Sequence, residues 1–232
     1  MIKAKHKPVE EIVQMVAPYK RVLVLGCNTC TAICFIGGEK EVAVLAKTLR
    51  LQDKANGGEK VFSEGMTQRQ CEWEFLDEAA PSIADADAVL SLACGVGMNA
   101  MAEHFSSTPV LPGNDTAFLG LPQELGVFKE KCVACGDCIL HITGGLCPIA
   151  RCAKRLFNGP CGGSVKGICE VSKDVPCIWQ MIIDRLQRLG QLSNLDSVWP
   201  VRNWRTNDAL GPRSFLREDL RVGAMLEKGG RG

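Results

Sequence analysis

The sequence contains few of the residues from which enzymes build acid–base or nucleophilic sites. Its only three histidines are His6, His104 and His141, and none of them stands in a pattern with a partner residue. No serine–histidine–aspartate set, Walker loop or pair of catalytic carboxylates can be recognised. Asp115 and Asp137 fit turns better than a catalytic role. We therefore expect no catalytic residue here, and a role in which another protein performs the chemistry.

Long apolar segments are also lacking. The longest apolar run, residues 88–98, is too short to span a membrane, and residues 1–20 lack the apolar stretch of a secretory signal. We therefore expect a cytoplasmic protein without a membrane span, whose cysteines are reduced or metal-bound rather than disulfide-linked. The formal net charge is +1 with every cysteine neutral. Many metal-bound thiolates would make the protein acidic, which argues against a nucleic-acid partner.

Cysteine, by contrast, is abundant, with 13 among 232 residues. Five lie in the first part of the chain and eight lie close together in the second part. The candidate metal ligands are Cys27, Cys30, Cys34, Cys71 and Cys94, followed by Cys132, Cys135, Cys138, Cys147, Cys152, Cys161, Cys169 and Cys177. Three of the eight follow one another at two-residue spacing, and a later one precedes a proline. This pattern is typical of bacterial ferredoxins and predicts electron transfer.

The eight-cysteine segment can supply two sites of four thiolates each. Two [4Fe-4S] clusters would use all eight cysteines, whereas one cluster with one structural zinc, or two zincs, is the alternative. Zinc ribbons usually contain two separate Cys-x2-Cys pairs. Here a triple is followed by widely spaced single cysteines, which favours iron–sulfur clusters. The spacing does not tell which cysteines share a cluster.

The first part of the chain alternates between apolar strand patterns and helical patterns. Such alternation predicts an α/β fold with a small parallel, Rossmann-like sheet. A short helix is expected within residues 1–20. Strands are expected over residues 21–26, from 60 toward 71, over 86–93 and over 109–112, and helices over 39–51, 72–80 and 99–105.

Cysteines follow the expected strands at the point where each strand ends. Cys27 and Cys94 come directly after two strands, and Cys71 follows the polar extension of another. In open parallel sheets, ligands bind outside the carboxyl ends of the strands. Cys30 and Cys34 would complete a three-ligand loop with Cys27. With Cys94 or Cys71 as the fourth ligand, the five cysteines predict one further cluster with one thiol to spare; structural thiols or zinc are the alternative.

The segment Gly95–Ala100 offers a different interpretation, because it matches a Gly-x-Gly-x-x-Ala dinucleotide fingerprint with Asp115 about twenty residues further on. A single match of this kind is weak evidence. The cysteine at the end of the preceding strand favours metal over pyrophosphate.

The composition changes after Pro122, where glycine, cysteine and proline become frequent. We expect an α/β domain over residues 1–121 and a cysteine-rich domain over 122–192 that bound metals organise. A helix capped by Asp174 and ended by Gly190 would close this second domain. Residues 193–232 are expected to form an extended arm. The arm carries Trp199, Pro200, Trp204, Pro212 and Phe215.

Several motifs together resemble one known family. They are residues 24–30 with 37–42, residues 90–97, and a long stretch from Cys132 to Glu170 that includes the Gly-Pro-Cys-Gly-Gly-Ser element at 159–164. This combination closely resembles the methylenetetrahydrofolate reductase C-terminal-domain family. Its free-standing members are the small iron–sulfur subunits of methylenetetrahydrofolate reductase in acetogenic bacteria. The resemblance covers about residues 20–220.

The resemblance implies a non-catalytic electron-transfer subunit of an oxidoreductase complex. Its partner would be a TIM-barrel subunit that holds a flavin and reduces 5,10-methylenetetrahydrofolate to 5-methyltetrahydrofolate in the methyl branch of the Wood–Ljungdahl pathway. A heterodisulfide-reductase-like or Rnf-like module would donate electrons. All 13 cysteines are then candidate ligands for two or three [4Fe-4S] clusters, or for clusters and one zinc. The alternative is a zinc-stabilised scaffold that assembles the reductase without carrying electrons.

Overall fold

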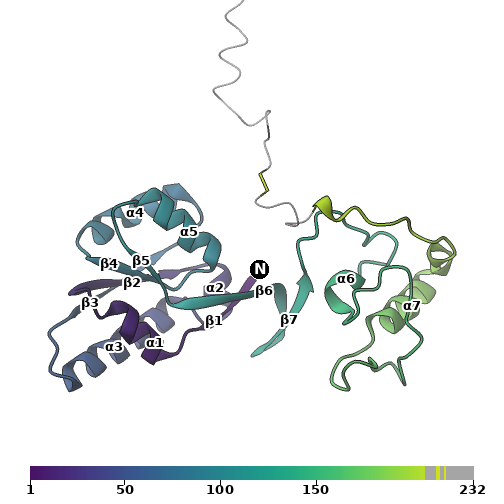
Figure 1. Cartoon of the computed structure of the whole chain (residues 1–232), viewed down its shortest axis with the longest axis horizontal. Coiled ribbons are helices and arrows are strands. Elements are labelled where there is room, and N and C mark those ends of the chain that lie inside the picture. The colour runs from purple at the N-terminus through teal and green to yellow at the C-terminus, as the bar shows by residue number, and fades with distance from the viewer. Residues whose placement is uncertain (207–212, 215–216, 218–232) are drawn as a thin grey trace, which may run out of the picture. The chain divides into compact units, whose positions relative to one another are not determined.

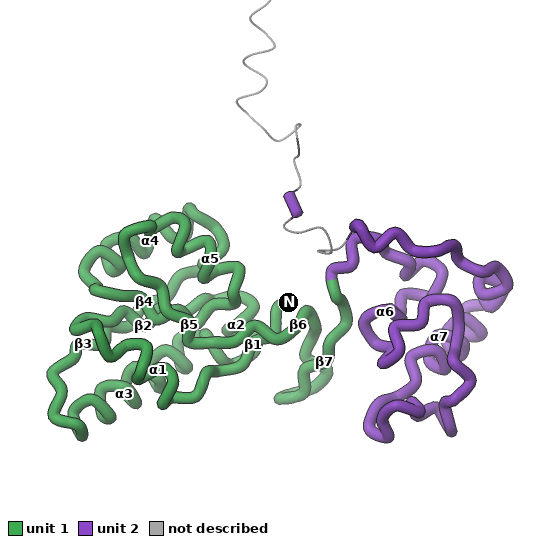
Figure 2. The backbone as a smooth tube through the Cα atoms, viewed as in Figure 1, with its two compact units in different colours: residues 1–133 green, residues 134–232 purple. Residues whose placement is uncertain are grey.

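The computed structural model describes residues 1–206, 213, 214 and 217, and the chain divides into two compact units, Met1–Val133 and Ala134–Gly232 (Figure 2). The sequence-based boundary between residues 121 and 122 falls within a strand of the first unit. The cysteine-rich domain at 122–192 and the arm at 193–232 stay predictions. Pro212 and Phe215 of that arm lie outside the described residues.

Unit 1 is a mixed α/β structure in which strands and helices alternate (Figure 1). Its elements are β1 (Ile2–His6), α1 (Val9–Val16), β2 (Arg21–Cys27), α2 (Cys30–Ile33), α3 (Glu39–Ala55), β3 (Val61–Thr67), α4 (Trp73–Ala84), β4 (Ala88–Ser91), α5 (Gly95–His104), β5 (Val110–Pro112), β6 (Asn114–Glu124) and β7 (Val127–Cys132).

The central sheet of unit 1 contains four parallel strands in the order β3-β2-β4-β5. Strand β2 is buried over six of its seven residues because helices cover both faces of the sheet. Helices α1 and α3 pack on one face around Val24 and Leu90, and α4 and α5 pack on the other around Leu23 and Leu25 (Figure 1). The prediction of an α/β fold with a parallel sheet is confirmed.

A second sheet of unit 1 was not expected from the sequence. Strands β1, β6 and β7 form it in the order β1-β6-β7, and both pairings are antiparallel. The prediction of a helix is correct for residues 9–16 but wrong for residues 2–6, which pair with β6 instead. The deciding partner, β6, lies more than 100 residues further along the chain, so local patterns gave no sign of the pairing.

Unit 2 contains little regular structure among its described residues. Its elements are the helices α6 (Pro148–Arg151) and α7 (Ile178–Leu189) and the 3-10 turns η1 (Leu192–Leu195) and η2 (Trp204–Thr206). One small core of Ile178, Trp179, Ile182 and Leu186 lies on the buried face of α7. That core is much smaller than the two apolar clusters of unit 1.

The closing helix of unit 2 ends where the sequence predicts but begins later. Gly190 adopts the left-handed conformation at the C-cap, with φ of 67°. The predicted cap at Asp174 is wrong, because Cys177 takes the N-cap position after Pro176. In unit 1, similarly, α5 begins at Gly95 rather than at Asn99, so Cys94 is its N-cap.

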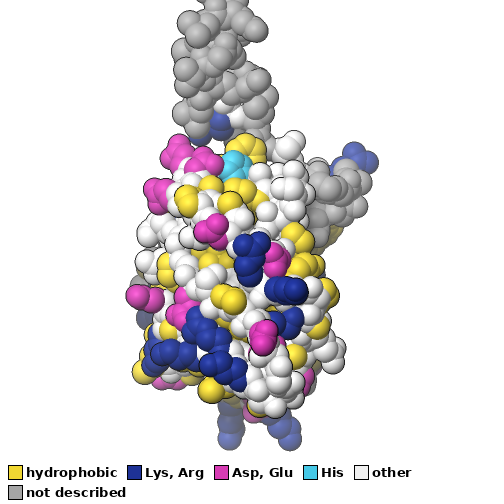
Figure 3. All heavy atoms as spheres, turned by 90° about the vertical axis from the view of Figure 1, so that its left-hand side faces the viewer, with side chains coloured by type: hydrophobic (Ala, Val, Ile, Leu, Met, Phe, Trp, Pro, Cys, Tyr) yellow, Lys and Arg dark blue, Asp and Glu magenta, His cyan; other side chains and the backbone are white. Residues whose placement is uncertain are grey.

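The surface of unit 1 mixes charged and apolar side chains. On the face drawn in Figure 3, Lys and Arg side chains gather in one region, and hydrophobic side chains are scattered among charged ones. Across the described residues, we find no helix with the length and apolar character needed to cross a membrane.

Candidate metal centres

Three cysteines of unit 1 meet at the carboxyl ends of the parallel strands. Cys27 is the last residue of β2, Cys94 caps α5 after β4, and Cys71 follows β3. Burial raises the pKa of the Cys71 thiol, and the negative charges of Cys27 and Cys94 raise it further. The three cysteines thus follow three neighbouring parallel strands, β3, β2 and β4, at one edge of the sheet.

Gln70 fixes the loop that carries Cys71. Its fully buried side chain donates hydrogen bonds to the carbonyls of Leu25 and Gly26, both at 3.0 Å, and accepts one from the Ser91 hydroxyl at 2.6 Å. One amide thereby joins the ends of β2 and β4 to the segment after β3. This arrangement holds the backbone beside Cys71 in place, as a preorganised site requires.

The remaining two cysteines of unit 1 lie on the short helix α2. Cys30 begins this helix and is partly exposed, and it is one of the charges that act on Cys34. Cys34 is only 2% exposed, packs with Ala4 and Ile36, and donates its S–H to the carbonyl of Ile2 at 3.5 Å. Burial raises the pKa of Cys34, which favours the neutral thiol. Cys34 therefore has the surroundings of a structural cysteine.

The geometry disfavours a nucleotide at Gly95–Ala100. The backbone N–H of Gly95, which would face a pyrophosphate, donates to the Thr116 hydroxyl at 2.7 Å. Asp115, the candidate ribose ligand, lies on β6 and forms an ion pair with Lys7 at 2.8 Å. Both groups are thus engaged within the protein.

Four cysteines of unit 2 line one small cavity of about 20 Å³. They are Cys152, Cys161, Cys169 and Cys177. Ile178 and Trp179 form an apolar wall, and Lys154 forms an ion pair with Glu170 at the same cavity. Four thiols around an enclosed space match the donor set of a four-thiolate metal centre.

Local backbone structure brings these four cysteines together. Cys152 follows α6, and Cys177 caps α7, where its sulfur lies at the positive end of a helix. Between them, Cys169 donates its N–H to the Val175 carbonyl at 2.8 Å, and Cys177 donates its own to the Gly167 carbonyl at 2.7 Å. These contacts fold the segment back on itself and place Cys169 beside the N-terminus of α7.

The ferredoxin-like triple lies in a tight loop. Cys132 ends β7, and Ala134 and Gly136 both adopt the left-handed conformation, with φ of 50° and 81°. Alternation of this kind turns successive backbone N–H groups toward one side and favours a negatively charged ligand there. Cys147 caps α6, and its sulfur accepts the N–H of Ala150 at 3.4 Å.

The segment of residues 196–206, which we call the strap, crosses this loop within unit 2. Arg202 of the strap has a fully buried side chain that donates to the Cys135 sulfur at 3.0 Å. The Thr206 hydroxyl donates to the carbonyl of Cys135 at 2.9 Å. The sequence predicts an extended arm here but gives no sign that Arg202 contacts a cysteine.

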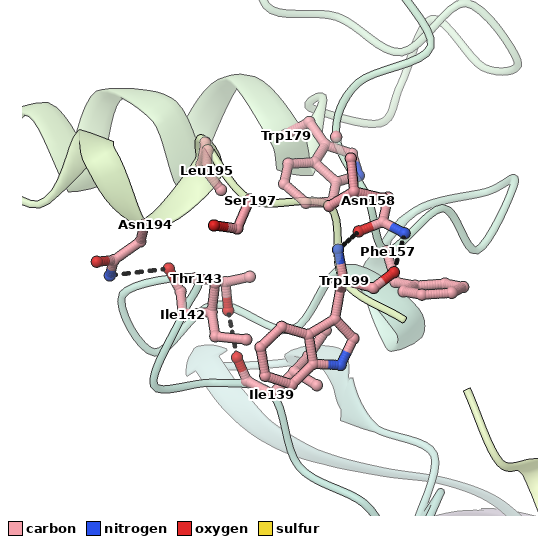
Figure 4. A pocket seen from close by; sticks show the side chains of 12 residues that line it. Ile139, Ile142, Thr143, Phe157, Asn158, Trp179, Asn194, Leu195, Ser197 and Trp199 are labelled. Carbon is pink, nitrogen blue, oxygen red and sulfur yellow. Dashed lines mark hydrogen bonds between the residues drawn. The ribbon is translucent and has the colours of Figure 1, made fainter. Parts of the chain in front are cut away.

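A second contact of the strap is shown in Figure 4. The side-chain amide of Asn158 donates to the Trp199 carbonyl at 2.8 Å and accepts the Trp199 N–H at 2.7 Å. The indoles of Trp179 and Trp199 face a pocket that carries no charged side chain. These contacts hold Trp199 of the strap against Asn158 within unit 2.

A comparison with protein-family models finds a match for the second part of the chain. Residues 111–205 match the model of a family described as methylene-tetrahydrofolate reductase C terminal. This segment is similar to that family. The resemblance seen in the sequence is therefore confirmed over residues 111–205, and over the rest of the range 20–220 it stays a prediction. Neither the curated proteins nor the solved structures contain a match to the chain.

The methylene-tetrahydrofolate reductase C-terminal segment includes all eight cysteines from Cys132 to Cys177 and the strap with Arg202. Among the residues that the structure describes, no three or more His, Cys, Asp or Glu side chains are placed closely enough to hold a single metal ion. The four cysteines of the cavity supply the donors of a four-thiolate centre, although the cavity itself, at about 20 Å³, has room for no more than about one water molecule.

Proposed function

We propose that this chain is an iron–sulfur electron-transfer subunit of a methylenetetrahydrofolate reductase. The observation that carries the proposal is the shared cavity of Cys152, Cys161, Cys169 and Cys177, inside the segment that matches the reductase family. Four thiolates around one space are the donor set of a [4Fe-4S] cluster. The family description names an oxidoreductase of one-carbon metabolism.

We assign the other cysteines of the family segment by elimination and spacing. With four cysteines at the cavity, Cys132, Cys135, Cys138 and Cys147 remain for a second cluster. The two left-handed residues in this loop turn backbone N–H groups toward the ligand, which supports this assignment.

A third cluster is proposed at the sheet edge of unit 1. Cys27, Cys71 and Cys94 would bind it there, with Cys30 as the fourth ligand. Cys34 is the spare thiol, because its side chain is buried among apolar residues and bonded to a backbone carbonyl.

In this role the chain binds and tunes clusters and performs no bond chemistry itself. When bound, the clusters supply one-electron transfer. The thiolates hold them, and Ile178 and Trp179 exclude water from one side of the cavity. Cys177 at the N-terminus of α7 is favoured as a thiolate by the helix dipole. Burial, backbone N–H groups and nearby cations then set the potentials.

The proposed partner is a TIM-barrel subunit whose flavin collects the single electrons in pairs. That subunit would reduce 5,10-methylenetetrahydrofolate to 5-methyltetrahydrofolate, in the methyl branch of the Wood–Ljungdahl pathway. A heterodisulfide-reductase-like or Rnf-like module would supply the electrons. The family description supports an association with the reductase, and the resemblance in sequence motifs supports the rest.

Metal analysis tests this proposal directly. The full chain, purified without oxygen, is analysed for iron, zinc and acid-labile sulfide and examined by EPR after reduction. We expect about eight to twelve irons per chain with matching sulfide, four for each cluster. One or two zincs with almost no iron would instead establish the zinc scaffold.

Paired cysteine variants sharpen this test. Cys161→Ser removes one ligand of the cavity and is expected to lose about four irons and four sulfides. Cys34→Ala is the matched control and should keep the full content, because Cys34 lies in an apolar core. Equal losses from both variants would contradict the assignment of ligands.

A further inference from the structure

Arg202 is unusual among the charged residues because its guanidinium group is completely buried. The side chain has no exposed surface, although it belongs to an irregular segment. One terminal nitrogen, Nη2, donates to the Cys135 sulfur at 3.0 Å and to the carbonyl of Asp137. A charge in this position needs strong compensation, because burial removes its hydration.

The protein supplies only part of that compensation. The Nε and Nη1 atoms of Arg202 are buried and have no hydrogen-bond partner within the described residues. The nearest carboxylate oxygen, of Asp137, lies 3.6 Å from Nη1, and that side chain is 51% exposed. A buried cation with unused donors next to a cysteine sulfur indicates an additional anionic acceptor at this place.

Contacts of the strap and of Arg213, beyond it, hold Arg202 against the Cys135 loop. The Thr206 hydroxyl and the Arg213 guanidinium donate to the carbonyls of Cys135 and Ala134, at 2.9 and 3.1 Å. Asn158 secures the strap at Trp199 through two hydrogen bonds. Three separate contacts therefore position the guanidinium, so its approach to Cys135 is not an accident of one flexible side chain.

We propose that Arg202 is a positioning residue for the cluster at Cys135, and that it couples docking of the strap to the redox state of that cluster. This inference rests on the proposed function. The anionic acceptor is the thiolate-bound cluster, whose sulfur atoms receive the donors that the protein leaves unused. Reduction adds one electron and makes the cluster more negative, so Arg202 stabilises the reduced state and raises the reduction potential.

The coupling must act in both directions. If docking of Arg202 favours the reduced cluster, reduction must favour docking of the strap by the same factor. The strap therefore closes more tightly over the loop when the cluster carries the extra electron. A partner that binds this surface would meet a different strap in each redox state.

Three variants test the proposal in the full chain. Arg202→Met removes the charge and keeps the approximate length, Arg202→Lys keeps the charge without the planar set of donors, and Arg205→Met is the control at an exposed neighbour on the strap. Potentials are measured by EPR-monitored titration with dithionite. Hydrogen exchange of residues 196–206 is measured in the oxidised and reduced states.

We expect Arg202→Met to lower the potential of one cluster only and to abolish the slower strap exchange that reduction causes in the original chain. Arg202→Lys should shift the potential less, and Arg205→Met should change neither. The inference would be overturned if Arg202→Met had the same potentials as the original chain and its strap still exchanged more slowly after reduction. If Arg202→Met loses iron, its potential cannot be compared, and Arg202→Lys is used instead. A cluster potential lower than that of the original chain in Arg202→Lys supports the inference, and an unchanged potential refutes it.

The metal content separates this inference from the function on which it rests. Full iron and sulfide with unshifted potentials refutes the role of Arg202 alone. Absence of iron from the original chain refutes the proposed function, and the inference with it.

Discussion

The two units both contain many cysteines, but they differ in what else can hold them folded. Unit 1 buries two apolar clusters on the two faces of its parallel sheet. Unit 2 has one core of four buried residues on α7, and the cysteines surround irregular loops. Burial of apolar surface is the main driving force of folding, so unit 1 can form around its side chains. In unit 2 we expect the proposed metal ligation to supply the stability that its small apolar core does not.

The largest expected effect comes from removing the metal. A chelator applied under reducing conditions should unfold most of unit 2 and leave the sheet of unit 1 intact. Three of the four tryptophans, Trp179, Trp199 and Trp204, lie in unit 2, so tryptophan fluorescence should shift strongly to the red. Hydrogen exchange resolves the two units. If residues 134–206 keep their protection without metal, the proposed contrast between the units is wrong.

Truncating a core side chain of unit 1 should have the next largest effect. It should lower the stability of unit 1 and leave unit 2 unchanged. Leu90 is fully buried between β2 and the helices α1 and α3. Leu90→Ala is expected to lower the free energy of unfolding of unit 1 by about 2–5 kcal/mol. Denaturant titration followed by circular dichroism measures this.

Leu51→Ala is the matched control for this truncation. The Leu51 side chain is 70% exposed, so its removal should change stability by less than about 0.5 kcal/mol. Metal content of unit 2 should be the same in both variants. Loss of iron from the eight-cysteine segment in Leu90→Ala would show that the units do not fold independently.

The smallest effect concerns an ion pair at the start of β2. Asp87 accepts hydrogen bonds from the side chain and backbone of Arg21, which lower the pKa of its carboxyl below 3.8. A lowered folded-state pKa gives stability that is present above the unfolded pKa and is lost as pH falls through the folded one. The contribution of Asp87 should therefore disappear below pH 3.8. It should be small, because the pair is exposed.

Acid titration of Asp87→Asn checks this expectation. The variant should be slightly less stable than the original chain at neutral pH, and the difference should vanish at low pH. Glu78→Gln, at an exposed carboxylate on α4, serves as the control and should show no such pH dependence. A difference that grows as the pH falls would contradict the assignment.

The sequence predicts the parallel sheet well because its signals are local. Buried strands such as β2 consist of consecutive branched apolar residues, and the helices between them have apolar faces at regular spacing. Gly190 ends α7 because glycine readily adopts the left-handed conformation. By contrast, local patterns predict a helix where β1 forms, since the partner strand β6 is remote in sequence.

In the candidate sites, too, some features can be predicted from the sequence and others depend on the fold. The number of cysteines and their positions after strands follow from the sequence, and so does the resemblance of residues 111–205 to the reductase family. Which cysteines share a cavity does not, because Cys152, Cys161, Cys169 and Cys177 meet only after the backbone folds back before α7.

The sequence by itself determined that this chain has an α/β part, a cysteine-rich part and the donor atoms for metal centres. Residue chemistry and short-range periodicity are sufficient for those conclusions. Only the tertiary structure placed Cys34 in an apolar core and the strap across the Cys135 loop with Arg202 buried there. Arg202 lies 67 residues beyond Cys135. Contacts over such separations depend on the folding of everything between them, so no local pattern of residues encodes them.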